Sequence, residues 1–116
     1  MPEELYTKKE YQSLLLKTLG DSPKLRIIDF FLDNPLFDYT KNEVIKALGM
    51  SKQTFYKYFK DVESYGTVKV SRKIGGASLY KISLESPLVK MLREYETHIL
   101  LQIAEKEAEK QAQTIP

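Results

Sequence analysis

Residues 51–66, SKQTFYKYFKDVESYG, interleave three lysines with aromatic side chains. If this stretch is helical, Phe55, Phe59 and Val62 follow one another at spacings of four and three and form one apolar stripe. The lysines and several polar side chains then lie off the stripe. Such a cationic side can donate hydrogen bonds to phosphate groups, or it can be the solvated side of an amphipathic helix. The stretch alone is compatible with both interpretations.

The charge of the chain is unevenly distributed. Its 116 residues carry a formal net charge of +2. Positions 40–81 hold nine basic and three acidic residues, a net charge of +6, whereas the remainder holds nine basic and thirteen acidic residues, a net charge of −4. A basic middle segment between acidic flanks favours one surface that binds a polyanion.

Few residues of the chain indicate any other chemistry. The sequence contains no cysteine and a single histidine, His98. Disulfides and thiolate metal sites are therefore excluded, and we expect neither a histidine-based metal site nor metal sensing. No nucleophile–histidine pairing, phosphate-binding glycine loop or cluster of metal ligands is evident, so we predict that the chain is not an enzyme and needs no cofactor. We interpret His98 as a residue of a helix surface or interface rather than as a pH switch.

The length and hydropathy of the chain indicate one soluble domain. A chain of 116 residues has the size of a single domain. No apolar run approaches the roughly 20 residues needed to cross a bilayer. The N-terminal sequence MPEELYTKKE has neither the basic nor the apolar region of a signal peptide. We therefore predict a cytoplasmic protein that has no membrane partner.

Two predicted helices open the chain. The first spans about Thr7 to Leu19, where apolar residues recur at spacings of three and four. The second begins after Ser22, which can cap it, with Pro23 in its first turn. Its predicted core-facing side chains are Leu25, Ile28, Phe31 and Leu32.

A third helix and the tight turn after it position the lysine-rich segment. Thr40 and Glu43 have the spacing of a capping box at the start of this helix. Gly49 stands where a left-handed residue would end it. Only Met50 separates Gly49 from Ser51, the predicted N-cap of the next helix. Because the link is so short, the two helices must cross steeply, as in a helix-turn-helix.

A β-hairpin and a long helix complete the predicted order of elements. Residues 67–84, TVKVSRKIGGASLYKISL, are rich in β-branched residues, and Gly75-Gly76 predicts the turn between two strands. The tip of this hairpin, SRKIGGAS, is basic. Ser86 and Pro87 form another cap and first turn, and apolar residues continue from Leu88 to Ile103 along the last helix.

This order of elements resembles the winged helix-turn-helix family of DNA-binding proteins, in particular small archaeal and bacterial transcription regulators. The resemblance lies in TKNEVIKALGMSKQTFYKYFKDVESYGTVKV (40–70) followed by SRKIGGASLYKI (71–82). It implies a mainly α chain with a small β-hairpin, with a winged helix-turn-helix core at 21–85. An N-terminal helix at 1–19 and a C-terminal dimerisation helix at 86–112 would flank that core, all within one winged-helix domain.

The resemblance also implies which residues contact DNA. The second helix of the motif enters the major groove with its N-terminal end toward the base edges, where Gln53 can pair with adenine and Lys52 can donate to guanine. The hairpin tip corresponds to the wing, which contacts the backbone or the minor groove, and the start of the preceding helix can donate to phosphates. The predicted DNA-binding residues are Thr40, Lys41, Asn42, Lys52, Gln53, Thr54, Tyr56, Lys57, Lys60, Arg72 and Lys73. For Tyr56, packing within the protein is the alternative to contact with DNA.

We further predict a homodimer, because one such helix reads few base pairs and a two-fold dimer places two of them about one turn of DNA apart. The flanking helices would supply the interface, at Leu14, Leu15, Leu88, Leu92, Tyr95, Ile99 and Ile103. The alternative is a monomer in which both helices fold back on a single core.

The function inferred from these patterns is sequence-specific binding of double-stranded DNA as a dimeric transcription regulator. The alternative is a winged-helix protein–protein interaction module without sequence-specific DNA binding, since a fold does not determine its function. The lysines favour DNA, because a protein-binding surface would more often carry apolar residues in their place. The patterns reveal no site for a small-molecule effector.

Overall fold

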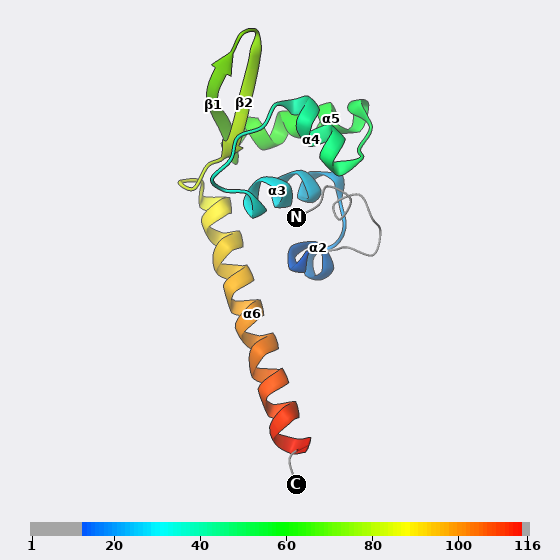
Figure 1. The fold of residues 1–116 in the computed structure, drawn as a ribbon, viewed down its shortest axis with the longest axis vertical. Helices are drawn as coiled ribbons and strands as arrows, with labels where there is room; N and C mark the ends of the chain where they lie inside the picture. Colours follow the sequence, from blue (N-terminus) through cyan, green and yellow to red (C-terminus); the bar gives the residue numbers. More distant parts are fainter. Residues whose placement is uncertain (1–12, 115–116) are drawn as a thin grey trace.

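The computed structural model describes residues 13–114. The part of the first predicted helix that precedes Ser13 lies outside the described residues. The elements are α2 (Leu14–Leu19), α3 (Pro23–Asp33), α4 (Lys41–Leu48), α5 (Lys52–Ser64), β1 (Val68–Ile74), β2 (Ala77–Ile82) and α6 (Pro87–Thr114). Figure 1 shows α4, α5 and the hairpin gathered at one end of the molecule, while α6 leads away toward the other end. This arrangement confirms the predicted winged-helix-like fold with flanking helices.

Helix α3 lies at the centre of the core. Its residues 27–32 are all buried, because α2, α4, α5 and β2 all pack against this helix. Ile28, Phe31 and Leu32 are buried as predicted, whereas Leu25 is only partly buried against the core. Burial of each large apolar side chain contributes roughly 1.5–3 kcal/mol, so this helix carries much of the stability of the fold.

The helix-turn-helix is held by local capping interactions. The Thr40 N–H donates to Glu43 Oε1 at 2.8 Å, and the Glu43 N–H donates to Thr40 Oγ1 at 3.2 Å, which completes the predicted capping box. Gly49 adopts the left-handed conformation, with φ 62° and ψ 29°, which a residue with a β-carbon adopts only at a cost. The turn therefore has the short, rigid form that the sequence predicts.

The hairpin pairs β1 with β2 in antiparallel fashion, from Val68 opposite Ile82 to Ile74 opposite Ala77. At the turn only the first glycine has a positive φ, which is 60° at Gly75. The pairing register shifts between Val70 and Arg72, where β1 contains a bulge.

One further residue attaches this hairpin to the helices. Tyr39, in the connection between α3 and α4, exchanges two backbone hydrogen bonds of 2.8 Å with Tyr80 of β2. The ring of Tyr80 also meets the ring of Phe59 edge to face, with centroids 5.0 Å apart. The base of the hairpin is therefore anchored to both α5 and the α3–α4 connection.

Helix α6 gives the molecule its elongated shape. Its 28 residues correspond to about 42 Å at 1.5 Å per residue, and the radius of gyration of 16.6 Å exceeds the ~13 Å expected for a compact domain of this length. Within residues 13–114, no helix combines the length and the apolar character that crossing a bilayer requires.

Helix α6 turns only some of its apolar residues toward the core. Val89 is fully buried and Leu92 nearly so, whereas Met91 is 66% exposed and Leu88 41% exposed. Tyr65, which follows α5, is also exposed. The apolar spacing of a helix does not by itself reveal which of its apolar residues meets a neighbour.

Candidate nucleic-acid interface

Helix α5 divides into a buried and a cationic side. Phe55, Phe59 and Val62 are at most 2% exposed. Lys52, Gln53, Lys57 and Lys60 are all exposed.

Three of these exposed residues have a regular relationship to the buried stripe. Gln53, Lys57 and Lys60 each precede a member of that stripe by two positions. Two positions correspond to about 200° around a helix of 3.6 residues per turn. An amide and two lysines therefore form a second stripe that faces away from the core.

The N-terminal end of α5 is shaped by its cap. Ser51 Oγ accepts the Thr54 N–H at 3.1 Å and donates to Thr54 Oγ1 at 2.8 Å. Thr54 is half-buried, and its hydroxyl belongs to the cap, so it is less available to a ligand than predicted. Lys52 and Gln53 remain as the exposed side chains of the first turn, where the helix dipole favours anions.

Lys41 occupies a cage of aromatic rings between α4, α5 and the hairpin. Its Nζ lies 5.4 Å from the ring centroid of Tyr56, 5.3 Å from that of Phe59 and 5.6 Å from that of Tyr80. These distances are within the range of cation–π attraction. Tyr56 thus serves in packing around Lys41 while 44% of it stays exposed.

Lys41, Tyr56 and Tyr80 of this cage also line a groove of about 280 Å³ between the helices and the hairpin. The residues that line it are Thr40, Lys41, Asn42, Tyr56, Gly76, Ala77, Ser78 and Tyr80. The hydroxyl oxygen of Thr40 is engaged in the capping box, whereas Asn42 is exposed. The groove joins the predicted contacts at the start of α4 to Tyr56 of α5, whereas the predicted hairpin contacts Arg72 and Lys73 do not line it.

Arg72 is not a free cation of the wing. Its Nε donates to Asp38 Oδ2 at 2.8 Å and its Nη2 donates to Asp38 Oδ1 at 3.3 Å. The hydrogen bonds from Arg72, and to a smaller extent one from Ser71, lower the pKa of Asp38. The ion pair therefore stays ionised at neutral pH. Lys73, the neighbouring predicted contact, is exposed.

The hairpin also carries a pair of cations that sequence reasoning missed. Lys69 lies directly opposite Lys81, and like charges in that relationship destabilise a strand pair. If the two strands paired residue by residue from the Gly75-Gly76 turn without a bulge, Lys69 would lie opposite Ile82 instead. The bulge at Ser71 shifts the register by one residue, and no signal in the sequence marks it.

The residues predicted for a dimer interface fall into three groups. Leu15 and Leu92 are buried in the core of the chain itself, so packing within the chain occupies the positions expected to meet a second copy. Leu14, Tyr95 and Ile99 are half-buried. Only Leu88 and Ile103 present large exposed fractions, of 41% and 42%.

A separate group of polar residues lies where α3 meets α6. Asp29 is only 3% exposed, although the sequence offered no reason to expect an acidic residue in the core. Burial, with the nearby carboxylates of Asp33 and Glu96, raises the pKa of Asp29 to about 7, and a hydrogen bond with Ser13 partly opposes this shift. Burial and the charge of Asp33 also raise the pKa of Glu96.

Solved structures that share this fold include the two described next. One is that of the M. tuberculosis protein Rv0081, with a TM-score of 0.54 at 19% sequence identity, over 81% of this chain and 89% of that one. The other is a possible transcriptional regulator from Methanosarcina mazei Go1, with a TM-score of 0.52 at 14% identity, over 89% of this chain and 86% of that one. At such identities the likeness concerns the fold alone. No protein-family model matches the chain, and no curated protein matches it either.

Proposed function

We propose that the chain binds double-stranded DNA in a sequence-specific manner and regulates transcription as a homodimer. The observation that carries the proposal is the outward stripe of Gln53, Lys57 and Lys60, directly opposite the buried side of α5. In helix-turn-helix proteins the second helix of the motif lies in the major groove, with its N-terminal residues against the base edges. Helix α5 holds the corresponding position after α4.

In this proposal, some side chains of α5 contact bases and others contact phosphate groups. Gln53 offers the amide that pairs with adenine, and Lys52 offers a donor for the acceptors of guanine. Lys60 lies two turns farther along, where a phosphate contact positions the helix without reading sequence. The proposed activity is therefore binding without catalysis.

The groove and the hairpin extend this surface beyond α5. In this proposal Lys41 and Asn42, which line the groove, and Lys73, which pairs with the lining residue Ser78, donate to the backbone of a duplex that covers the groove. Neutralisation by phosphate would also relieve the repulsion between Lys69 and Lys81. The description of the Methanosarcina mazei neighbour as a possible transcriptional regulator is consistent with this role.

The outer half of α6 supports the proposed dimer. Leu100, Leu101 and Ile103 are 42–56% exposed, in a part of α6 that extends beyond the rest of the domain in Figure 1. Association of two copies along this helix would cover these side chains. It would also place two α5 helices on one duplex, about one turn of DNA apart.

Selection of bound duplexes from a random pool by the full chain tests this function. We expect a two-fold-symmetric site whose half-sites are separated by about one helical turn. Recovery of no enriched sequence, together with capture of another protein from nuclease-treated extract, would favour the protein-interaction alternative instead.

A further inference from the structure

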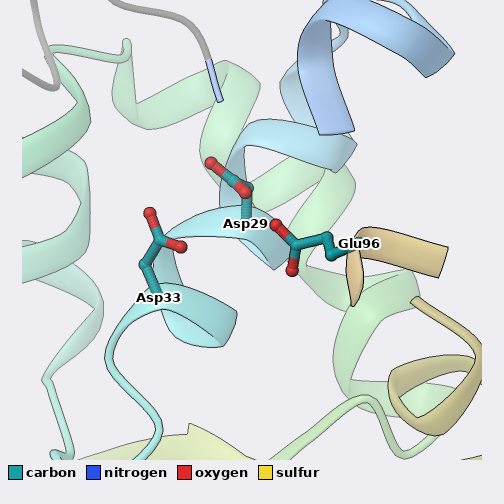
Figure 2. Close-up of side chains that lie close together, drawn as sticks. All are labelled: Asp29, Asp33 and Glu96. Atoms are coloured by element: carbon teal, nitrogen blue, oxygen red, sulfur yellow. The ribbon is translucent and has the colours of Figure 1, made fainter. Parts of the chain in front are cut away.

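Three carboxylates converge where α3 meets α6. Asp29 and Asp33 are one turn apart on α3 and therefore share a face, and Glu96 approaches them from α6. One oxygen from each of the three lies within 4.8 Å of the other two. Figure 2 shows the Asp29 side chain between those of Asp33 and Glu96.

Within residues 13–114, the Oδ1 atom of the buried Asp29 has no hydrogen-bond partner. Such an atom is unusual, because the large majority of buried polar side-chain atoms are hydrogen-bonded, and an unpaired buried carboxylate is costly. Among the described residues, the groups that act electrostatically on Asp29 are Asp33, Glu96 and the hydroxyl of Ser13. The two charged groups have the same sign as Asp29 itself. Among the residues that the structure describes, the site thus places an unused buried acceptor beside two further carboxylates.

We propose that Asp29, Asp33 and Glu96 bind one hard divalent cation between α3 and α6. Oxygen ligands lie about 2.0–2.6 Å from Mg²⁺ or Ca²⁺, so two ligands of one ion are at most about 4–5 Å apart, which agrees with the spacing of these oxygens. A donor set made only of carboxylates suits Mg²⁺, Mn²⁺ or Ca²⁺ rather than metals that prefer nitrogen or sulfur. The prediction from sequence that the chain has no metal site considered thiolate and imidazole ligands, whereas the proposed site combines carboxylates from two distant helices.

The exposure of the three ligands provides an entry path for the cation. Asp29 is buried, Glu96 is half-buried and Asp33 is exposed. A hydrated ion can approach from the side of Asp33 and keep water ligands there, as Mg²⁺ usually does in proteins. The bound ion would link the central helix of the core to α6 and so fix the direction of the long helix. The site is independent of the proposed contacts with DNA.

Titration of the metal-free full chain with Mn²⁺ near neutral pH, with free Mn²⁺ followed by electron paramagnetic resonance, tests the site. We expect saturable binding of one Mn²⁺ per chain, competition by Mg²⁺ or Ca²⁺, and a rise in the melting temperature. Asp29→Asn and Glu96→Gln should each weaken binding by at least the roughly 10–100-fold that loss of a supporting residue costs at metal sites. Glu94→Gln is the matched control, because it removes an exposed carboxylate from the same helix and should leave the affinity unchanged.

Two results would overturn the site. One is the lack of saturable binding at millimolar Mn²⁺. The other is binding of equal strength to the wild-type chain and to the folded Asp29→Asn and Glu96→Gln variants, which would place the ion elsewhere. Both variants should fold, because Asn and Gln keep the shape of the side chain and remove a charge. Far-ultraviolet circular dichroism checks that they fold. The two substitutions lie on different helices, Asp29→Asn on α3 and Glu96→Gln on α6.

Discussion

Arg72 of the hairpin forms a two-point ion pair with Asp38 in the α3–α4 connection, with N–O distances of 2.8 and 3.3 Å. The Arg72 side chain is 60% exposed, whereas that of Asp38 is 15% exposed. An ion pair of this exposure contributes little to stability. The ion pair instead ties the hairpin to the α3–α4 connection. It also engages the charge of Arg72, which would otherwise be available to a phosphate group.

Release of Arg72 should strengthen non-specific binding to DNA. In Asp38→Asn the guanidinium loses its charged partner, so it can neutralise a phosphate. The slope of log K against log salt for a random duplex should become steeper by about 0.9, which corresponds to one additional phosphate contact. Fluorescence anisotropy at several salt concentrations measures this slope.

A double variant serves as the control for this prediction. Arg72→Ala in the Asp38→Asn background should remove the gain. Weaker binding by Asp38→Asn alone would show that the ion pair positions the hairpin for DNA, which is the opposite of the expected effect.

Gln53 and Lys60 should affect DNA binding in different ways. Gln53→Ala should cost about 1–3 kcal/mol on the selected site and relax the preference at one base pair. Lys60→Ala should weaken binding to all duplexes about equally and reduce the salt slope by about 1. Competition assays with single-base variants of the selected site distinguish the two patterns. Equal losses on every duplex for both variants would argue against a base contact by Gln53.

The raised pKa of Asp29 predicts that its contribution to stability falls as the pH rises. The carboxyl keeps its proton in the folded chain up to about pH 7, because burial and the nearby carboxylates raise its pKa from the ordinary 3.8 to about 7. Between about pH 4 and pH 7 the unfolded state therefore binds fewer protons, and the free energy of unfolding decreases with pH. The total effect is on the order of 4 kcal/mol, at about 1.36 kcal/mol for each unit of pKa shift.

Urea denaturation of the wild-type chain and of Asp29→Asn in the presence of a chelator measures this effect. The two proteins should have similar stability near pH 5, since a neutral carboxyl resembles an amide. Near pH 8 the variant should be the more stable of the two. If both proteins show the same dependence on pH, Asp29 does not titrate in the predicted range.

The sequence was sufficient to predict the features that depend on local interactions. The capping box of Thr40 and Glu43, the left-handed Gly49 and the cap at Ser51 are encoded within a few residues of one another. Together they determine the helix-turn-helix, and the apolar spacing of Phe55, Phe59 and Val62 then determines which side of α5 faces outward. The main features of the candidate interface follow from these local signals.

The remaining features depend on contacts between distant segments. The bulge at Ser71 sets Lys69 opposite Lys81, and Asp38 captures Arg72 from 34 positions away. The burial of Val89 depends on how α6 lies against the core, as does the approach of Glu96 to Asp29. No short pattern in the sequence encodes these relationships, so several side chains have partners that sequence analysis did not foresee.

The central claim is that the outward side of α5 binds DNA, and a comparison of two charge-matched variants tests it most directly. One variant combines Lys52→Ala with Lys57→Ala on α5, and the other combines Lys106→Ala with Lys110→Ala, two exposed lysines in the outer half of α6. Both change the net charge by the same amount. We predict that the α5 variant loses affinity for the selected duplex by about 1–3 kcal/mol or more, while the α6 variant binds almost as the wild-type chain does. Equal affinity of the two variants would contradict the claim.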